Sequence, residues 1–434
     1  MGYNNGRWLE KDDGIPNRVI EQLAIPAMRY FLSKANGDAK KRFYSLVLDA
    51  ESIKYQSDCL KMLKTRNKVV IRSSEFDKNP HLLNLQNGTY DLKLNVFNPH
   101  EITDYLTKQA PATFNAESVC PRWLNFLSEI LPKDIIAYLQ VLFGACLSGV
   151  LIQKIWLFLG NGGNGKSVLL RVLGDLLGSG YCVQMPQNAF IRQHNTSSIR
   201  PELVDLRGSR LAISAEIEEG ALNESLIKNL VGGDLIRARN PYERMTGFAP
   251  THKLIISGNG EPSISGTDRG IWRRVRKVSF DKTITKEIPF DTLVADLIAE
   301  SSGILNWLLE GWKKYQKEGL IEPESIRISN KVFQADQDSL QQFIDEQMDV
   351  PGPQCTVEFK IKSSLFIECF NSWLKKLGFQ TWSSKTISNR LTHKGFIKKR
   401  YNDAIYWVGM SFSPEKTTTG FHPDDFKVTN EFFK

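Results

Sequence analysis

Residues 160–167 have the types and the spacing needed to bind a nucleoside triphosphate. They read Gly-Asn-Gly-Gly-Asn-Gly-Lys-Ser and match the phosphate-loop pattern GxxxxGK[ST]. Glycines let successive backbone amides turn toward phosphate oxygens, because a Cβ would block both the dihedral angles and the approach. We expect Lys166 to reach the β- and γ-phosphates of ATP and Ser167 to hold Mg²⁺. The predicted ATP-binding residues are Gly160, Asn161, Gly162, Gly163, Asn164, Gly165, Lys166 and Ser167.

The segments on either side of this loop support that interpretation. "KIWLFL" (154–159) is apolar enough for a strand buried on both faces of a parallel sheet. "VLLRVLGDLL" (168–177) predicts a helix, whose N-terminus adds partial positive charge beside the phosphates. A chance glycine-rich turn is the alternative, and the two flanks together disfavour it.

An acidic residue at the end of a second apolar segment could assist hydrolysis. Glu216 follows "RLAISA" (210–215), and a carboxylate there can coordinate Mg²⁺ and polarise the attacking water. Glu218 and Glu219 come soon after, where carboxylates also favour a solvated helix start. We therefore predict Glu216 as the catalytic carboxylate, with Ser167 and Glu216 as the magnesium ligands.

Two further motifs could sense or stabilise the γ-phosphate. Asn259 ends "HKLIISG", and its amide could bond both the phosphate and the attacking water, although asparagines commonly end strands. Arg273 and Arg274 precede an apolar strand, and in a ring of subunits one of them could enter the neighbouring site as an arginine finger. A basic surface is the other interpretation of these arginines.

The elements that must position these residues alternate along the chain. Strands predicted at 154–160, 210–216, 252–259 and 273–280 indicate an α/β core with a central parallel sheet. A mainly helical segment (17–72) and a β-hairpin or meander (81–100) precede it. We predict helices at 121–130, 132–147 and 290–319, and helical material at 321–347.

The last part of the chain has the layout of a winged helix. Two helices (362–378 and 383–395) precede two strands (396–401 and 404–412), and Pro351-Gly352-Pro353 marks a boundary before them. Ser383 or Ser384 could cap the second helix, while Ile387 and Leu391 face the core. We expect outward cations on this helix and its wing to bind DNA, although many winged helices bind proteins instead. The predicted DNA-binding cations are Lys385, Arg390, Lys398 and Lys399, and Lys394 should face outward as well.

Composition narrows the classes of protein. The 434 residues carry a formal net charge of +8, which permits a polyanionic partner without proving one. The six cysteines form no CxxC pair, which argues against a zinc ribbon and a secreted disulfide framework. No apolar run approaches the roughly 18 residues that a membrane span needs. We expect a cytoplasmic protein, in a bacterial host cell, without a membrane partner.

The order of the motifs resembles that of superfamily 3 helicases, in particular the poxvirus and phage/plasmid primase-helicase branch. The resemblance rests on the phosphate loop, "ISAEIEEG", residues 226–259 and "DRGIWRRVRKVSF". It extends to residues 82–118 and to the C-terminal winged helix, and so covers most of the chain from about Pro80 onward.

This resemblance implies an AAA+-type fold, a hexameric ring and ATP-driven translocation on single-stranded DNA during replication of a phage, plasmid or mobile element. It implies that Glu216 is the acid, Asn259 the sensor and Arg274, or its neighbour Arg273, the finger. The family also has a basic hairpin that projects into the pore, and residues 232–248 match it. A cationic hairpin can grip phosphates without reading bases, although its charges could simply be solubilising. The predicted DNA-binding residues here are Arg237 and Arg239, followed by Lys228 and Arg244.

Many relatives carry a primase or polymerase domain ahead of the motor, and only about eighty residues precede the matching part here. We therefore expect a separate primase, or a chain that is a fragment of a larger one. The predicted domains are 1–118 (helical and hairpin region for oligomerisation, or for DNA or partner docking), 119–345 (ATPase) and 346–434 (winged helix). A helicase is the favoured function. An origin-melting loader, a nucleotide-gated DNA-binding initiator without processive unwinding and a P-loop kinase are the alternatives.

Overall fold

A computed structural model describes residues 2–9, 20–63, 71–192, 200–217, 221–264, 269–284, 288–350, 359–377, 379, 381–401 and 404–413. The chain forms two compact units. The first comprises Met1–Pro262 and Arg274–Arg327, and the second comprises Ser263–Arg273 and Ile328–Lys434. Buried residues between Leu83 and Ala112 share one hydrophobic core with the region predicted as the ATPase.

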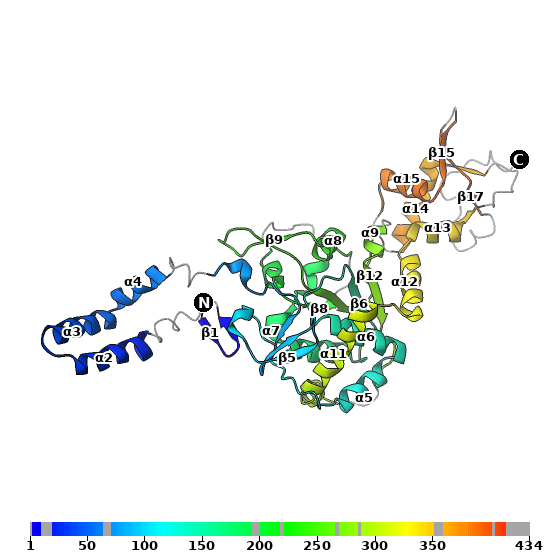
Figure 1. Ribbon diagram of the computed structural model, residues 1–434. Coiled ribbons are helices and arrows are strands. Elements are labelled where there is room, and N and C mark those ends of the chain that lie inside the picture. Colours follow the sequence, from blue (N-terminus) through cyan, green and yellow to red (C-terminus); the bar gives the residue numbers. More distant parts are fainter. Residues whose placement is uncertain are drawn as a thin grey trace, which may run out of the picture. The chain divides into compact units, whose positions relative to one another are not determined.

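A five-stranded parallel sheet forms the centre of the first unit (Figure 1). Its strand order is β12 (Val275–Ser279), β6 (Ile155–Leu159), β11 (Lys253–Gly258), β8 (Leu211–Ile217) and β7 (Cys182–Gln184). Every residue of β6 and β11 is buried, as their continuous apolar sequences predict. The predicted α/β class and its four strands are confirmed. The short edge strand β7 was not predicted.

Helices pack against the sheet and share its hydrophobic core. They are α5 (Pro121–Ile130), α6 (Lys133–Ala145), α7 (Lys166–Tyr181), α10 (Phe290–Ile298) and α11 (Ser301–Glu318). The first unit also contains α8 (Glu224–Gly232). The prediction of one helix over 290–319 is wrong, because α10 and α11 meet at 71°. The Glu300 carboxylate at the bend accepts hydrogen bonds from the backbone amides of Arg122 and Trp123, which are otherwise uncapped amides of α5. The bend at Glu300 therefore places its carboxylate where it caps the N-terminus of α5.

Among the described residues, no individual helix combines the length and the apolar character that crossing a membrane requires; only α10 and α11 taken together, as a bent pair, reach that threshold.

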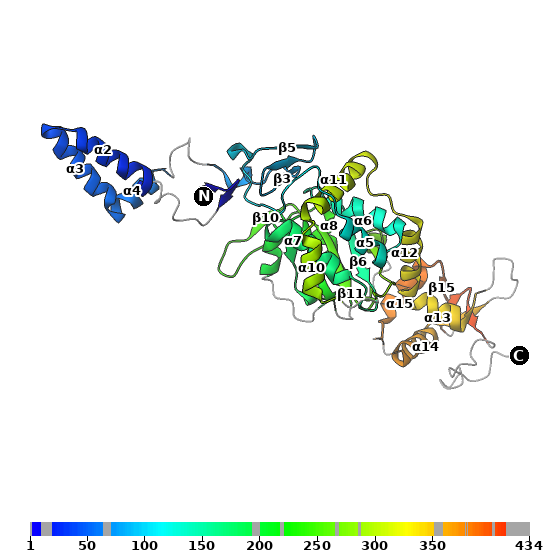
Figure 2. The same ribbon diagram turned by 90° about the horizontal axis from the view of Figure 1, so that it is seen from below.

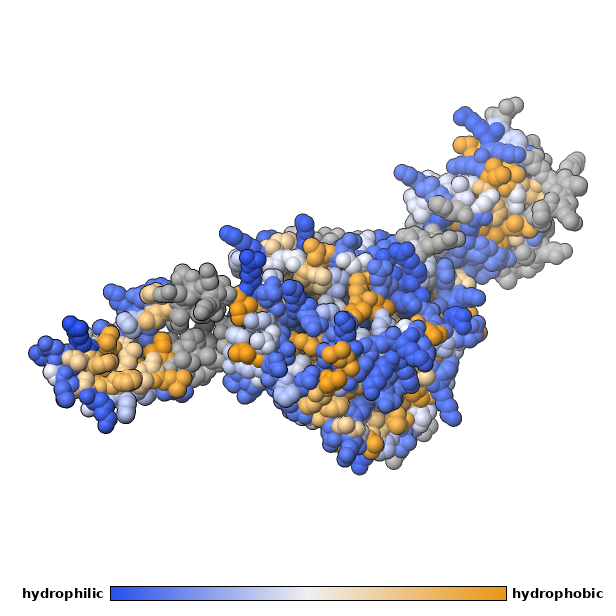
Figure 3. Space-filling model, viewed as in Figure 1, coloured by the Kyte–Doolittle hydropathy of each residue, from blue (hydrophilic) through white to orange (hydrophobic). Residues whose placement is uncertain are grey.

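Smaller elements precede the sheet along the chain. The helical prediction for 17–72 is confirmed where the chain is described, by the π-helical turn Ile20–Ala24, α2 (Ile25–Lys34), α3 (Gly37–Glu51) and α4 (Ile53–Leu63). Apolar side chains gather on one face of these helices (Figure 3). The predicted meander is β3 (Leu82–Asn84), β4 (Thr89–Asp91) and β5 (Val96–Asn98), while the hairpin of β1 (Gly2–Asn4) and β2 (Arg7–Leu9) was not predicted. Short 3₁₀ turns lie at Ser73–Glu75, Ile102–Asp104, Gln187–Phe190 and Pro201–Leu206.

The second unit has its own core. It contains α9 (Arg269–Trp272), most of α12 (Glu324–Asp336), α13 (Ser339–Gln347), α14 (Ser363–Lys376) and α15 (Ser384–His393). One sheet has the order β14 (Lys360–Lys362), β16 (Ile405–Val408), β15 (Ile397–Arg400), and β13 (Met348–Asp349) pairs with β17 (Ser411–Phe412). Ser383 caps α15 by accepting from the Thr386 amide, and Ile387 and Leu391 are fully buried, as predicted. The predicted boundary at Pro351-Gly352-Pro353 lies outside the described residues.

Candidate nucleotide and nucleic-acid site

The loop at residues 160–165 connects buried strand β6 to the first residue of α7. Gly162, Gly163 and Gly165 have φ of 91°, 60° and 77°, in the left-handed region that favours glycine. A Cβ on Gly160 would lie 2.3 Å from the carbonyl oxygen of Phe280. The loop therefore needs glycine for two separate reasons, backbone conformation and close packing against the end of β12.

Lys166 folds back over this loop. Its Nζ donates to the carbonyl oxygen of Gly160 and to Oδ1 of Asn164, both at 2.8 Å, and it lies 3.5 Å from Oδ1 of Asn259. The residue is only 4% exposed, and burial lowers the pKa of its ammonium group. Within the described part of the chain its hydrogen-bond partners are neutral oxygens, so an anion arriving in the loop would meet a positive charge that none of these partners neutralises.

Asn164 holds the loop in place from the inside. It is buried, its Nδ2 donates to the Phe280 carbonyl at 2.9 Å, and its Oδ1 accepts from Lys166. The backbone adds a bond from the Ile284 amide to the Gly163 carbonyl. The sequence pattern treats this position as variable, so the bridging role of Asn164 appears only in the structure.

Strand register brings the predicted catalytic segments to one edge of the sheet. Gly258 of β11 lies opposite Leu159 of β6 on one side and Ile217 of β8 on the other. Glu216 and Asn259 therefore both lie at the edge where the phosphate loop begins. Asn259 is exposed there. Glu216 belongs to β8, next to an irregularity in the pairing with β11, whereas the alternative acids Glu218 and Glu219 lie outside the described residues.

A cavity of about 460 Å³ opens over this edge. Ser167 and Ser257 line it, and both also line a second cavity of about 990 Å³ that follows α7 and β8. Ser257 was not predicted; it lies on β11 beside the irregularity in the pairing with β8. The remaining residues around the first cavity are 162–166, Val168, Gly258, Asn259, Ile284, Ile288, Phe290 and Leu293.

The arginines near β12 differ in accessibility. Arg273 is exposed, whereas Arg274 is 9% exposed and its carbonyl accepts a hydrogen bond from the Ile155 amide. An arginine that reaches a neighbouring subunit needs an exposed side chain, so exposure favours Arg273 over Arg274. Sequence alone preferred Arg274, because the family pattern registers position and not burial.

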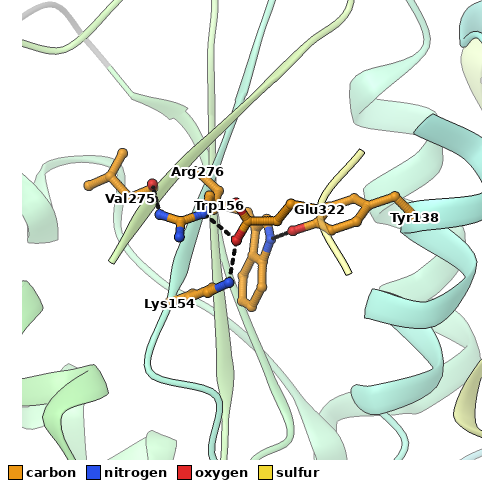
Figure 4. Close-up of polar contacts among 6 residues, drawn as sticks. All are labelled: Tyr138, Lys154, Trp156, Val275, Arg276 and Glu322. Carbon is orange, nitrogen blue, oxygen red and sulfur yellow. Dashed lines mark hydrogen bonds and ion pairs between the residues drawn. The ribbon is translucent and has the colours of Figure 1, made fainter. Parts of the chain in front are cut away.

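Arg276 is held inside the molecule by a carboxylate (Figure 4). Its Nε lies 2.6 Å from Oε1 of Glu322, which also bonds Lys154, and all three side chains are largely buried. Burial alone would raise the pKa of Glu322, but the hydrogen bonds and charges of Lys154 and Arg276 bring that pKa below its ordinary 4.5. Nearby, Trp156 Nε1 donates to the Tyr138 hydroxyl at 2.7 Å. This cluster fixes the amino ends of β6 and β12.

The structure contains a β-hairpin within residues 232–248, the segment predicted to form one. β9 (Ile236–Ala238) pairs antiparallel with β10 (Thr246–Phe248), and the loop between them extends from the core in both ribbon views (Figures 1 and 2). Arg237 and Arg244 are exposed and Arg239 is half-buried. Lys228 lies outside the hairpin, on α8, 3.8 Å from the carboxylate of Glu224. The structure thus places three of the four predicted cations on one hairpin.

Three of the cations that the sequence predicted to face outward in the second unit contact side chains of that unit. The Arg390 guanidinium lies 3.8 Å from the ring centroid of Trp382, and Lys398 Nζ lies 5.3 Å from that of Trp407. The expectation that Lys394 faces outward is wrong, because its Nζ bonds Asp338 at 2.5 Å and Gln341 at 2.8 Å. Lys394 turns inward because Asp338, the N-cap residue of α13, brings a carboxylate close to it, and the sequence around Lys394 does not predict this contact. Lys385 and Lys399 are exposed.

Comparison with known proteins bears on this arrangement. Residues 1–132 match the D5 N-terminal-like family, and residues 158–274 match a family of unknown function, DUF5906. The putative helicase L207/L206 of Acanthamoeba polyphaga mimivirus is 28% identical over 296 residues, covering 63% of this chain and 31% of that protein. The putative primase C962R of African swine fever virus (strain Badajoz 1971 Vero-adapted) is 26% identical over 402 residues, covering 82% of this chain and 41% of that protein.

These matches support the predicted likeness of this chain to superfamily 3-type primase-helicases. The D5-like match begins at residue 1, so the family likeness includes helices α2–α4 and does not start near Pro80 as expected. The chain spans about a third to two fifths of the length of these curated relatives. The apo C-terminal region of NrS-1 (residues 305–718) is a solved structure with 13% identity and a TM-score of 0.40, covering 69% of this chain and 78% of that one. The predicted bacterial host stays a prediction, since both curated relatives come from large DNA viruses.

Proposed function

We propose that this primase-helicase relative is an ATP-dependent DNA helicase, built on an AAA+-type core that works as a hexameric ring. The observation that carries the proposal is the shared sheet edge, where a glycine phosphate loop, Lys166, Glu216 and Asn259 come from three neighbouring strands. The names of the viral relatives, a putative helicase and a putative primase, agree with a role in DNA replication.

The residues at this edge fit ATP with Mg²⁺. A glycine cradle that a Cβ would fill and a buried lysine bonded to the neutral oxygens of Gly160 and Asn164 are suited to phosphate oxygens. Ser167 and Glu216 would hold the Mg²⁺, which neutralises charge that develops on the phosphates. Asn259 would orient the attacking water, and Lys166 would stabilise the β- and γ-phosphates.

An oligomer would complete the site. In the proposed ring, exposed Arg273 of one subunit stabilises transition-state charge in the next, with Arg274 as the alternative finger. Helices α2–α4 offer an oligomerisation surface, because they expose large apolar residues that a single copy leaves in water. These residues are Tyr30, Phe31, Tyr44, Leu46, Leu48, Ile53 and Tyr55, and Leu23 in the preceding π-helical turn is exposed too.

DNA would be bound at two places. Single-stranded DNA would lie against the β9–β10 hairpin, where Arg237, Arg239 and Arg244 contact phosphates in the pore. The second unit would act as a winged helix, with α15 and the β15–β16 hairpin on duplex or origin DNA. Primer synthesis would come from a separate primase or polymerase partner.

ATP hydrolysis by the purified chain tests the motor. Lys166→Ala should abolish hydrolysis with and without single-stranded DNA, while Lys133→Ala, an exposed lysine at the start of α6, should hydrolyse normally. Arg273→Ala should bind nucleotide normally but lose turnover, with Arg327→Ala on α12 as the matched exposed control. Turnover that is the same in isolated single copies and in oligomers would contradict the shared site.

Strand separation on forked substrates distinguishes the alternatives. A helicase should unwind a fork in an ATP-dependent way, and its hydrolysis should rise with single-stranded DNA. An origin-melting loader or nucleotide-gated initiator should open only short duplexes and show no processive unwinding. A kinase should require a phosphate acceptor and ignore DNA altogether.

A further inference from the structure

Tyr242 stands at the apex of the β9–β10 hairpin with its side chain fully exposed. Its relative exposure is 106%, and every residue from 241 to 247 is exposed as well. The base of the hairpin is anchored differently, since Ile236, Ala238 and Phe248 are buried. Because the Tyr242 ring is fully exposed at the tip, it buries no apolar surface that would stabilise the single chain.

The backbone at Tyr242 is also strained. Its φ is 66°, in the left-handed region that bulky residues rarely occupy. The amide of Glu243 donates to the carbonyl of Asn240 at 3.1 Å, and Pro241 occupies the second position of the resulting turn. A turn with proline second and a positive φ third is the type II arrangement, whose third position favours glycine or asparagine. The chain places tyrosine where glycine would be least costly.

A second tyrosine with a positive φ, Tyr105, is held in that conformation by packing of its ring. Tyr105 has φ of 49°, and its ring packs against Trp8 and Phe76 with centroids 6.1 and 5.8 Å apart. Tyr242 makes no ring contact and no side-chain hydrogen bond within the described part of the chain. Packing therefore accounts for the strain at Tyr105 and does not account for it at Tyr242. Backbone strain that is not offset by packing contacts is typical of functional positions.

The surroundings of the ring point to the chemistry of its ligand. Arg244 follows two residues later and Arg237 lies on β9, both exposed. The carboxylate of Glu243 is occupied by the Asn240 side chain, whose Nδ2 donates to Oε2 at 2.9 Å, which keeps the acid within the turn. An exposed aromatic face beside cations is the combination that binds single-stranded nucleic acid, with bases on the ring and phosphates on the guanidinium groups.

We infer that Tyr242 is a base-stacking site for single-stranded DNA, and that the strained turn holds its ring outward to meet an unpaired base. This inference rests on the proposed function and adds a contact that its phosphate-binding arginines do not supply. Stacking on a tyrosine ring is insensitive to base identity, because every base has a π-face. A translocating motor gains a grip that does not depend on sequence.

Binding of a fluorescein-labelled oligothymidylate to the full chain, measured by anisotropy over a series of salt concentrations, tests the inference. Tyr242→Ala should weaken binding by roughly 5-fold or more, the loss typical of one stacked base, without changing the salt dependence. Tyr242→Phe keeps the π-face and should bind within about 2-fold of the original chain. Met245→Ala is the matched control, because Met245 is exposed on the same loop and has no aromatic ring.

Arg237→Ala separates the inference from the proposed function. Loss of a phosphate contact should lower the magnitude of the salt slope by about 0.7, which loss of stacking does not do. If Arg237→Ala weakens binding while Tyr242→Ala binds normally, the stacking site is wrong and the DNA-binding hairpin stands. If the unaltered chain fails to bind the oligonucleotide, both proposals fail.

Thermal unfolding of Tyr242→Asn gives an independent check. Asparagine tolerates a positive φ, so this variant should unfold at the same temperature as the original chain or a higher one while binding the oligonucleotide more weakly. A lower unfolding temperature would mean that the ring supports the fold, and would overturn the inference.

Discussion

The two cationic hairpins of this chain use their positive charges differently. On the β9–β10 hairpin, Arg237 and Arg244 are exposed, and neither forms an ion pair with a carboxylate among the described residues. On the β15–β16 hairpin, Lys398 lies over the ring of Trp407 and donates to Ser388 Oγ at 3.1 Å. The first hairpin keeps its charges available, whereas the second shares at least one of them with its own unit.

This difference determines what an incoming phosphate must displace. An exposed arginine without a carboxylate partner exchanges only water and counterions for a phosphate, and the released counterions favour binding. A lysine that already contacts an aromatic ring and a hydroxyl must give up those contacts or keep them at a longer distance. The number of cations on a surface is therefore a poorer guide to DNA binding than the number without internal partners.

The largest expected effect comes from removing the available charges. The double variant Arg237→Ala with Arg244→Ala should lose roughly 10- to 100-fold in affinity for single-stranded DNA at low salt, since two charge-assisted contacts disappear. The salt slope should shrink by about 1.4 in magnitude, as expected for two phosphates of a single strand. Fluorescence anisotropy at several salt concentrations measures both. Unfolding temperature serves as the control and should not change, because both side chains are exposed.

The next largest effect concerns Lys154 and Arg276, which share the carboxylate of Glu322. Disrupting this cluster should lower the stability of the fold and leave DNA affinity unchanged. Glu322→Gln leaves Lys154 and Arg276 without their negative partner, and we expect a loss of about 2 kcal/mol in the free energy of unfolding at neutral pH. The pKa of Glu322 is lowered in the folded state, so its contribution is present above the unfolded pKa near 4.5 and is lost as pH falls through the folded pKa.

Denaturant unfolding of the variant and the original chain across pH 3 to 7 checks this sign. The difference between them should be largest at pH 7 and should shrink below pH 4.5. DNA affinity should stay unchanged throughout the range where both are folded. A variant that loses DNA affinity at unchanged stability would place Arg276 among the available cations after all.

Much of the fold could be predicted because local sequence determines it. The all-apolar β6 and β11, the proline-started α5 and the capped α15 each follow from their own residues. The break between α10 and α11 could not be predicted, since it depends on Glu300 bonding amides at residues 122 and 123, far away in sequence. Strand β7 was missed because three residues at a sheet edge carry too short a pattern.

The candidate site divides in the same way. The phosphate loop was predictable, because its glycines and Lys166 act through positions fixed by a short pattern. The burial of Arg274, the pairing of Lys394 and the access of Ser257 to the sheet edge depend on tertiary neighbours, which no local pattern encodes. Tyr242 lies in a turn whose sequence, Asn-Pro-Tyr-Glu, could have signalled an outward aromatic residue.

A moderate effect is expected from the second hairpin. Lys398→Ala with Lys399→Ala should weaken duplex binding by roughly 3- to 10-fold and leave DNA-stimulated ATP hydrolysis unchanged. Both lysines are exposed, but Lys398 already contacts the ring of Trp407, so we expect the single variant Lys399→Ala to account for most of the loss. Competition between labelled duplex and single-stranded oligonucleotides measures the preference. Equal losses from the two single variants would show that ring contact does not restrain Lys398.

The smallest expected effect concerns Lys394, the cation whose predicted role the structure changed. Its Nζ bonds the carboxylate of Asp338 and the amide oxygen of Gln341, and its side chain is 19% exposed. Lys394→Met retains most of the aliphatic stem but removes the charge, and we expect a loss of about 1 kcal/mol in the free energy of unfolding with no change in duplex affinity. Asp338→Asn should cost a similar amount, and combining the two should cost less than their sum, because the second change removes a group that the first has already left unpaired. A double-variant cycle by denaturant unfolding measures this coupling. Additive losses would contradict the coupling between the two groups, and weaker duplex binding by Lys394→Met alone would place Lys394 among the cations available for DNA.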